Sequence, residues 1–340
     1  MTRVTIMGAG DMGTALVIPL AHNGHEVRLW GTERDGAIIA ALRAGKAHPR
    51  LGISVPGDVQ TFTSEESAEA FDEAEVVVVA ITSDSVRAVL SRLAPVPGVP
   101  RVVVTVAKGF DAGPDGNDIQ LLPATIAEFT NAPVVAVGGP SKANEVARSL
   151  PTAVVFGSLD VEAVTLARKV FATPRYRIEP TDDIAGLEVA AAMKNAYAIA
   201  LGVADGLEQR TGLPHHNLRA ALFPRAVTEM GALARSLGGQ AETVFGLAGA
   251  GDLQVTITSG RNRLLGERIG RGDSPSDAVR ALANAGTTVE GYQAADFGYR
   301  SYRRAVDVGA LAEGSLRLLD ALWQVLYRDA EPAATLWSAV

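Results

Sequence analysis

The sequence contains no cysteine, which excludes disulfide bonds, thiolate catalysis and cysteine-ligated metal sites. Aromatic residues make up only 5% of its 340 residues, while hydrophobic residues make up 47%. Ala, Val, Leu and Ile must therefore fill most of the interior, as in sheets flanked by helices. A chain of this length exceeds the size at which one hydrophobic core usually stops growing, so two domains are expected.

Positive charge is also scarce, because 31 Lys and Arg stand against 38 Asp and Glu, which gives a net charge of −7. Nucleic acids and anionic membranes therefore have no general electrostatic reason to bind. The longest apolar stretch, 184–207, is interrupted by charged residues that a bilayer centre would penalise, so it predicts a core helix without membrane insertion. The amino terminus predicts no export signal, and we expect a cytoplasmic protein.

Metal ligands are not grouped in the sequence. The five histidines show no helical spacing that could hold a metal, and no carboxylate cluster supplies an oxygen cage. We therefore predict no metal. A Gly-x-Ser-x-Gly elbow and an ATPase-type phosphate loop are both missing, so nucleophilic hydrolysis is unsupported as well.

Strand and helix patterns alternate through the first half of the chain. Short β-branched runs predict buried parallel strands at 4–7, 26–30, 76–81, 102–107, 134–137 and 153–156. Helical patterns lie between them at 13–23, 36–44, 83–93 and 121–129. Beyond about residue 180 the pattern is helical to the end. The fold class predicted is α/β, with a doubly wound parallel-sheet domain over 1–180 and an all-α domain over 181–340.

A glycine-rich turn, Gly8 to Gly13, follows the first predicted strand and opens the first helix. Gly8 permits a tight turn, Gly10 lets the backbone approach a pyrophosphate, and Gly13 lets helix and strand pack closely. Asp11 and Met12 complete the turn, and the helix N-terminus supplies amide donors to an anion. The position of the motif favours a Rossmann-type dinucleotide site over a purely structural turn.

Cofactor choice depends on the residues that follow the second strand. Glu33 lies where an acidic side chain would bond the adenosine ribose hydroxyls, which indicates NAD. Arg34 is adjacent and could bind the 2′-phosphate of NADP, and either side chain could be a solvated loop charge. NAD and NADP both remain open.

Two further segments stand at the carboxyl ends of predicted strands, where ligands of open α/β sheets lie. Lys108 follows the fourth strand, and Gly139 and Ser141 follow the fifth. Lys108 is either a site residue or an exposed loop lysine. Ser141 could contact a ligand, cap a helix over 142–149, or do both.

Lys194 and Asn195 lie in a helix that is otherwise Ala, Leu, Ile, Val and Gly. No carboxylate lies three or four positions away to neutralise the lysine. A lysine buried there would be unfavourable by several kcal/mol, or lose its proton, unless a distant partner compensates. Asp252, delivered by a glycine-rich turn, is the candidate partner, and a snorkelling structural lysine is the alternative.

Hydroxyl, amide and guanidinium groups then gather within a few residues, at Ser259, Arg261 and Asn262. Such a loop suits a phosphate, because a guanidinium binds phosphate oxygens in a bidentate fork. A polar turn without a ligand is the alternative. Glu290 lies between a β-branched run and a glycine, and taken alone it carries no functional signal.

Together these residues resemble the NAD(P)-dependent glycerol-3-phosphate dehydrogenases over almost the full length of the chain. The motifs that carry the resemblance occur in the family's order: Gly8 to Gly13, Lys108-Gly109, Gly139-Pro140-Ser141, Lys194-Asn195, Gly246 to Leu253, Arg261-Asn262-Arg263 and Val289-Glu290-Gly291. The resemblance implies a Rossmann-type domain followed by a helical domain similar to the C-terminal domain of 6-phosphogluconate dehydrogenase. It also implies reversible reduction of dihydroxyacetone phosphate to sn-glycerol 3-phosphate, which feeds phospholipid synthesis.

Roles for the residues follow from the same resemblance. Lys194 would exchange a proton with the C2 oxygen, Lys108 would hold or polarise the substrate, and Asp252 would orient Lys194 and keep it charged. The substrate site would also include Gly139, Ser141, Asn195, Ser259, Arg261 and Asn262. The NAD or NADP site would include the glycine turn, Glu33, Arg34, Lys108, Ala143, Arg261 and Glu290.

Three departures favour the archaeal-type branch of the family. Asp11 and Met12 stand where bacterial members often have a serine and an aromatic residue. Gly260 stands where many have a serine, in a loop that looks about two residues shorter by comparison with the family motif, so phosphate contacts would come from Ser259 or from backbone amides. Thr32 and Glu33 replace a frequent basic residue, which leaves cofactor choice open.

Two other functions remain as alternatives. A related lysine-dependent reductase of keto or hydroxy acids would bind a carboxylate rather than a phosphate. A non-catalytic dinucleotide-binding sensor would have no reason to keep Lys194 together with Asp252. A homodimer is possible, because the family often dimerises.

Overall fold

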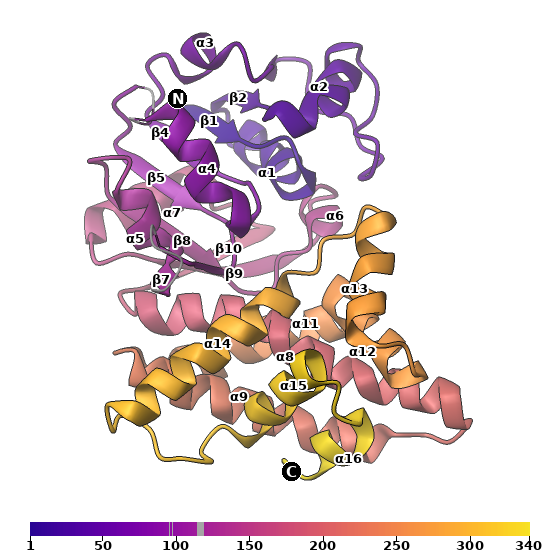
Figure 1. Ribbon diagram of the computed structural model, residues 1–340. Helices are drawn as coiled ribbons and strands as arrows, with labels where there is room; N and C mark the ends of the chain where they lie inside the picture. The colour runs from indigo at the N-terminus through magenta and orange to yellow at the C-terminus, as the bar shows by residue number, and fades with distance from the viewer. Residues whose placement is uncertain (95, 97, 114–118) are drawn as a thin grey trace. The chain divides into compact units, whose positions relative to one another are not determined.

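The computed structural model describes residues 1–94, 96, 98–113 and 119–340. The chain forms two compact units, Met1–Ile184 and Ala185–Val340. The sequence pattern predicts the division after residue 180. The first unit contains a sheet flanked by helices, and the second, all of whose residues are described, contains helices only (Figure 1).

An eight-stranded sheet forms the centre of the first unit, in the order β10-β9-β8-β5-β4-β1-β2-β3. Its strands are β1 (Arg3–Met7), β2 (Glu26–Trp30), β3 (Gln60–Phe62), β4 (Val76–Val79), β5 (Val102–Thr105), β8 (Val134–Gly138), β9 (Thr152–Gly157) and β10 (Tyr176–Thr181). A separate antiparallel pair is formed by β6 (Phe110–Asp111) and β7 (Gln120–Leu121). The predicted fold class is confirmed, since most pairings in the main sheet are parallel.

The helices of the first unit cover both faces of the sheet. They are α1 (Asp11–His22), the short helix η1 (Glu33–Asp35), α2 (Gly36–Arg43), α3 (Ser67–Phe71), α4 (Ser83–Leu93), α5 (Leu122–Ala127), α6 (Ala143–Val146) and α7 (Val161–Phe171). In β4, Val76 and Val78 pack into the core shared with α1, α2 and α7, while Val77 and Val79 pack into the core shared with α3, α4 and α5. This alternation explains the continuous valine run, because both faces of the strand are buried.

The direction predicted for residues 153–156 is wrong. Strand β9 runs antiparallel to β8, and β10 is parallel to β9. Only the four-residue helix α6 occurs between β8 and β9. Two parallel strands normally need a longer crossover connection, so the chain reverses direction and β9 pairs antiparallel with β8. The longer helix α7 connects β9 to β10, and these two strands pair in parallel.

The two outer strands, β3 and β10, were not predicted. In β10 only Tyr176 and Ile178 are buried, and they alternate with exposed Arg177 and Glu179. Pro180 follows, a residue that sheets tolerate at their edges. Such a segment is indistinguishable by composition from a polar linker, and the sequence analysis placed the end of the first domain there.

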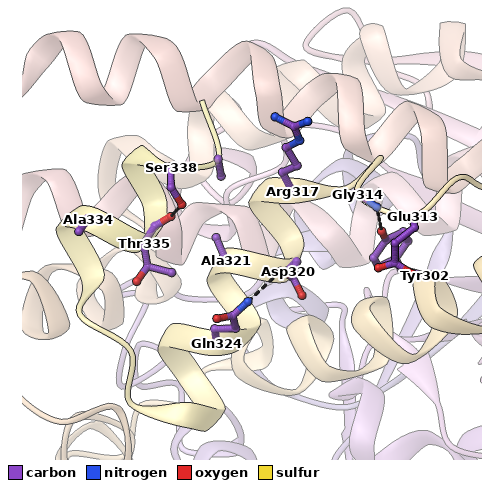
Figure 2. A pocket seen from close by; sticks show the side chains of 11 residues that line it. Tyr302, Glu313, Gly314, Arg317, Asp320, Ala321, Gln324, Ala334, Thr335 and Ser338 are labelled. Carbon is purple, nitrogen blue, oxygen red and sulfur yellow. Dashed lines mark hydrogen bonds between the residues drawn. The ribbon is translucent and has the colours of Figure 1, made fainter.

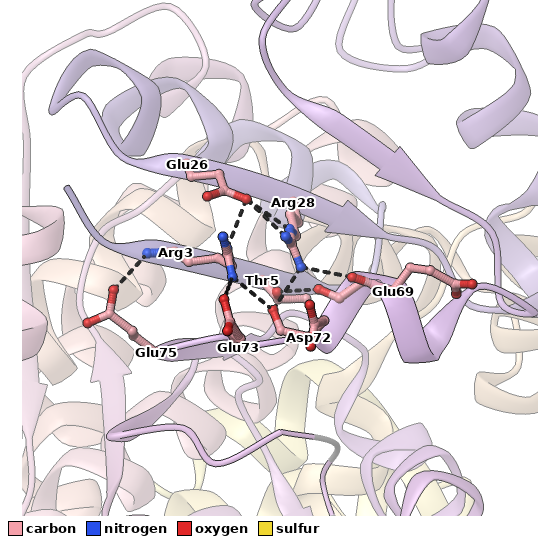
Figure 3. A network of polar contacts seen from close by, with 9 residues as sticks. Arg3, Thr5, Glu26, Arg28, Glu69, Asp72, Glu73 and Glu75 are labelled. Carbon is pink, nitrogen blue, oxygen red and sulfur yellow. Dashed lines mark hydrogen bonds and ion pairs between the residues drawn. The ribbon is translucent and has the colours of Figure 1, made fainter.

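A polar network joins the sheet to α3 and to the loop that follows it, among residues that carry no predicted site role (Figure 3). Arg28 of β2 donates hydrogen bonds of 2.8 Å to the carbonyl oxygens of Glu69 and Asp72. Arg3 of β1 pairs with Glu26 at 2.9 Å and with Glu73 at 2.6 Å. The last carbonyl groups of the short helix thereby gain donors that the helix itself cannot supply, so this charged cluster is structural.

The second unit is built around α8 (Ile184–Thr211). The other helices are α9 (His216–Ser236), α10 (Ala241–Phe245), the π-helix η2 (Leu247–Gly251), α11 (Asp252–Ser259), α12 (Arg261–Arg271), α13 (Pro275–Asn284), α14 (Glu290–Asp307), α15 (Arg317–Arg328) and α16 (Pro332–Trp337). By length and composition α8 could cross a membrane, but 89% of its most apolar window is buried in the protein. This burial is what a core helix requires.

Helices α8 and α12 approach closely through glycines. A Cβ atom added to Gly202 would overlap the carbonyl oxygen of Arg263, and one added to Gly266 would overlap that of Ile199. Backbone therefore packs directly against backbone along this pair of helices. The approach fixes the start of α12 relative to the middle of α8, where Lys194 and Asn195 lie.

Candidate functional site

The glycine turn has the geometry that its three glycines predict. Gly8 has φ of +108°, which L side chains rarely adopt, and an added Cβ would lie 2.6 Å from the oxygen of Ala80. An added Cβ at Gly13 would overlap the oxygen of Gly8. Gly10 is different, since no atom lies within 4 Å of the position its Cβ would take. A ligand can therefore approach the backbone at Gly10, at the N-terminus of α1, and this open cradle suits a dinucleotide pyrophosphate.

A carboxylate that the sequence analysis missed contacts this turn. Asp35 Oδ2 accepts hydrogen bonds from the backbone amides of Thr32, at 2.9 Å, and Ala9, at 3.3 Å. Glu33, which the spacing rule selected, is exposed and pairs with Arg92 at 3.1 Å, and Arg34 is exposed. A short helix of three residues turns Asp35 back towards the glycines. Thr32 and Asp35 form a capping box, and the spacing Thr-x-x-Asp is the local signal that could have indicated this turn.

Lys108 and Gly139 are brought together where β5 and β8 end. Lys108 Nζ donates a hydrogen bond of 3.0 Å to the carbonyl oxygen of Gly139. Ser141 lies near the glycine turn, with its Oγ 3.9 Å from Sδ of Met12. Of the roles left open for Ser141, helix capping is not the one found, because α6 begins at Ala143 with Lys142 as its N-cap residue. The short helix starts too late for the Ser141 hydroxyl to serve it.

In the second unit the structure pairs Lys194 with Asp252. Lys194 Nζ lies 2.5 Å from Asp252 Oδ1, and the two side chains are only 8% and 2% exposed. Lys194 lies inside α8, while Asp252 is the first residue of α11, directly after the π-helix that the glycine-rich turn forms. The carboxylate supplies the charge that the surroundings of Lys194 on its own helix lack, as the sequence analysis expected.

Asn195 is held beside this ion pair by Asn262. Asn262 Nδ2 donates to Asn195 Oδ1 at 2.9 Å, and Asn262 Oδ1 accepts from the backbone amide of Gly291 at 2.9 Å. An added Cβ at Gly291 would overlap the carbonyl oxygen of Asn195. The starts of α12 and α14 are thereby fixed against α8, and Glu290 is the first residue of α14. The predicted substrate contact of Asn262 stays a prediction.

The two arginines at the start of α12 differ in their surroundings. Arg263 pairs with Asp205 at 2.6 Å and with Glu267 at 3.2 Å, so its guanidinium has a structural role. Arg261 is exposed and makes no ion pair with any residue in the described ranges. Ser259, at the end of α11, is exposed as well. Of the two guanidinium groups, that of Arg261 is therefore the one available to an anionic ligand.

A buried carboxylate supports α8 one turn beyond Lys194. Glu229 of α9 accepts hydrogen bonds from the amides of Leu318 and Leu319, at 2.8 and 2.9 Å, and from the hydroxyl of Tyr197, at 3.0 Å. Burial raises the pKa of Glu229 to about 7, although its bonds to the two amides oppose the shift. The sequence analysis missed Glu229, because its partners lie on distant helices and two of them are backbone groups.

One pocket of the second unit lies away from these residues. About 560 Å³ in volume, it is lined by residues of α14, α15, α16 and the loop before α15, among them Tyr302, Arg317 and Asp320 (Figure 2). None of the predicted site residues lines it. Across the described parts of the chain, no group of three or more His, Asp or Glu is placed to hold a metal ion.

Comparison with known proteins assigns both halves of the chain to one family. Residues 3–164 match the sequence model described as NAD-dependent glycerol-3-phosphate dehydrogenase N-terminus, and residues 183–336 match the C-terminus. The NADP(+)-dependent glycerol-3-phosphate dehydrogenase of Archaeoglobus fulgidus is 38% identical over 331 residues, or 95% of each chain. The glycerol-3-phosphate dehydrogenase [NAD(P)+] of Chlorobium limicola is 38% identical over 82% of each chain.

Solved structures agree with this assignment. The crystal structure of glycerol-3-phosphate dehydrogenase from Coxiella burnetii has a TM-score of 0.81 at 29% identity, and the match covers 99% of this chain and 98% of that one. The Plasmodium falciparum enzyme has a TM-score of 0.85 at 18% identity, covering 99% and 94%, which shows a common fold. This chain is a member of the NAD-dependent glycerol-3-phosphate dehydrogenase family.

Proposed function

We propose that this protein is a glycerol-3-phosphate dehydrogenase that catalyses the reversible, NAD(P)H-dependent reduction of dihydroxyacetone phosphate to sn-glycerol 3-phosphate. The observation that carries the proposal is the buried ion pair of Lys194 and Asp252, next to the linked side chains of Asn195 and Asn262. The names of the related proteins support the substrate and the cofactor class. Its product would feed phospholipid synthesis.

The glycine turn of the first unit would bind the nicotinamide dinucleotide. The open position at Gly10 and the N-terminus of α1 fit the pyrophosphate, while Ala143, Glu33 and Arg34 are proposed as further contacts. When bound, the cofactor supplies the hydride that the reduction requires. Both NAD and NADP fit this part of the proposal.

Lys194 would act on the C2 oxygen of the substrate. Negative charge grows on that oxygen as the carbonyl carbon is reduced, and an ammonium group stabilises the charge and then gives up a proton from Nζ. Asp252 Oδ1, at 2.5 Å, orients the ammonium and favours its protonated form before the proton moves. In the reverse direction Lys194 takes the proton back.

Lys108 would hold or polarise the same substrate. Its bond to the Gly139 carbonyl fixes the direction of the ammonium group at the carboxyl ends of β5 and β8. A lysine ammonium has three donors, so it can bind more than one acceptor at a time. Gly139 and Ser141 are proposed as neighbouring substrate contacts.

The substrate phosphate would lie at the start of α12. Arg261 presents an exposed guanidinium there, and Ser259 adds a hydroxyl. Asn262 and Asn195, which are joined by a hydrogen bond, would also contact the substrate. Arg261 and Glu290 would contact the cofactor as well. A phosphate ligand is what separates this proposal from a reductase of keto or hydroxy acids, which would bind a carboxylate.

The experiment measures the loss of absorbance at 340 nm with NADH and with NADPH, for dihydroxyacetone phosphate, for unphosphorylated dihydroxyacetone and for a panel of 2-keto acids. Turnover of dihydroxyacetone phosphate alone supports the proposal and identifies the preferred nicotinamide. Turnover of a keto acid instead would assign the alternative reductase. Cofactor binding without turnover of any substrate would assign the non-catalytic sensor.

We also propose that the enzyme is cytoplasmic and forms a homodimer. The burial of α8 within the protein and the net charge of −7 agree with a soluble enzyme. Light scattering of the purified protein tests the dimer directly. A mass that matches 35.4 kDa would contradict it.

A further inference from the structure

His48 lies in the loop between α2 and β3, and its side chain is completely buried. The loop closes on this residue through its backbone, because the amide of His48 donates to the carbonyl of Ile53 at 2.7 Å and its carbonyl accepts from Gly52 at 2.9 Å. A lone histidine in a loop has no spacing signal, so the sequence analysis considered it only as a metal ligand. The position and the contacts of the ring indicate another role.

The contacts of the imidazole fix its tautomer. Nδ1 accepts hydrogen bonds of 3.2 Å from the backbone amides of Arg50 and Leu51, so Nδ1 carries no proton. The proton must then be on Nε2, which lies 3.2 Å from the carbonyl oxygen of Ala9. His48 therefore donates from Nε2 to the second residue of the glycine turn.

The peptide groups on both sides of Ala9 are held by side chains. The carbonyl oxygen of Ala9 also accepts from the hydroxyl of Thr14 at 3.0 Å, and the amide of Ala9 donates to Asp35 at 3.3 Å. With two donors bound, this carbonyl cannot turn towards an anion. The amides at the start of α1, which lack partners within the helix, then face the ligand without a competing oxygen dipole.

The charged neighbours of His48 agree with a neutral ring. Burial lowers the pKa of His48, and the groups that act on it are Asp11, Arg50 and Asp35. Asp11 Oδ1 lies 3.9 Å from Nε2 but pairs with Arg50 at 2.8 Å, so its charge is already compensated. A neutral ring with one donor and one acceptor satisfies every contact described above.

We propose that His48 is a positioning residue for the dinucleotide: it holds the Ala9 carbonyl away from the pyrophosphate and so sets the affinity for the cofactor. The inference rests on the proposed function, since it requires the dinucleotide to bind at the glycine turn. It predicts an effect on cofactor binding and little effect on the chemical step, because His48 is buried and contacts the turn through the Ala9 carbonyl.

Two carboxamide variants separate the two sides of the ring. His48→Asn places an oxygen near Nδ1, which keeps the acceptor for Arg50 and Leu51 but removes the donor to Ala9. His48→Gln places a nitrogen near Nε2, which keeps the donor to Ala9 but loses the acceptor. If His48 only shapes the 44–59 loop, His48→Asn should bind the cofactor with normal affinity. If the proposal is right, His48→Gln should bind the cofactor with normal affinity instead.

The measurement is the Kd for NADH and NADPH by fluorescence titration, with kcat and the KM of cofactor and substrate measured separately. The proposal predicts a Kd and a cofactor KM about 10-fold higher for His48→Asn, from one lost buried hydrogen bond, with kcat at saturating cofactor unchanged. It predicts near-normal values for His48→Gln.

Four outcomes overturn the inference. A normal Kd for His48→Asn, or a larger loss for His48→Gln than for His48→Asn, assigns His48 to its own loop. A fall in kcat with an unchanged Kd assigns it to another step. If the unaltered protein binds neither NADH nor NADPH, the proposed function fails and the inference fails with it. Melting curves of both variants show whether each sample is folded.

Discussion

Lys194 Nζ and Asp252 Oδ1 lie 2.5 Å apart, on two helices of the second unit, with both side chains almost fully buried. A buried charge without a partner is strongly unfavourable, so each of the two residues supplies the opposite charge that the other requires. The pair therefore keeps an ammonium group at a fixed position inside an apolar helix.

Asp252→Asn should lower kcat by about 100-fold, because the ammonium loses the carboxylate that orients it and favours its protonated form. The substitution preserves the shape of the side chain. Steady-state kinetics with saturating cofactor measure the effect, and cofactor Kd, which should not change, serves as the control. A kcat within twofold of the unaltered enzyme would show that the ion pair is only structural.

Arg261→Ala should raise the KM for dihydroxyacetone phosphate by roughly 10-fold or more, since a charge-assisted bond to the phosphate is lost. Arg271→Ala is the matched control, because it removes a guanidinium from the other end of α12. Unphosphorylated dihydroxyacetone provides a second comparison. An equal rise of KM in both variants would mean that general charge, and not a contact of Arg261, accounts for the effect.

Gly266→Ala should destabilise the second unit by roughly 1–3 kcal/mol, because the added methyl group overlaps the carbonyl of Ile199 and forces α8 and α12 apart. Activity should fall as well, since Asn262 would move away from Asn195. Gly36→Ala is the control, as its Cβ would meet no atom within 4 Å. Denaturant unfolding measures the difference, and equal stability of the two variants would refute the close packing.

Protonation of Glu229 should couple the stability of the protein to pH. Its pKa is raised from 4.5 to about 7 by burial, so between these values the folded protein binds more protons than the unfolded chain. Stability should therefore fall as the pH rises from about 4.5 to about 7, by up to about 3 kcal/mol, and should not change further above that. Glu229→Gln should remove this slope. The same slope in both proteins, measured by urea unfolding at several pH values, would assign it to other groups.

The sequence predicts those features that depend on local pattern or on an imbalance of charge. The run Val76 to Val79 predicts a buried strand, because both of its faces are apolar. The isolated Lys194 predicts a carboxylate partner elsewhere in the chain, and only a few segments could supply one. The direction of β9 could not be predicted in the same way, because it depends on the length of a connection that looked helical over 142–149 but forms a helix only at Ala143–Val146.

Contacts between distant segments account for most of what the sequence analysis missed. Asp35 reaches the glycine turn only because a short helix reverses the chain, and Glu229 binds backbone amides that carry no residue signature. Asn262 was expected at the phosphate, but its link to Asn195 could not be foreseen from spacing. The role of His48 could not be predicted from the sequence, because its partners are backbone groups of its own loop and of Ala9.

The central claim, that Lys194 transfers the proton in the reduction of dihydroxyacetone phosphate, is tested most directly by Lys194→Ala. Absorbance at 340 nm and cofactor Kd are measured on the same preparation, with Lys169→Ala, which removes an exposed lysine, as the control. The account predicts that Lys194→Ala abolishes turnover while cofactor Kd stays normal and the control remains active. Turnover by folded Lys194→Ala at the rate of the unaltered enzyme would contradict it.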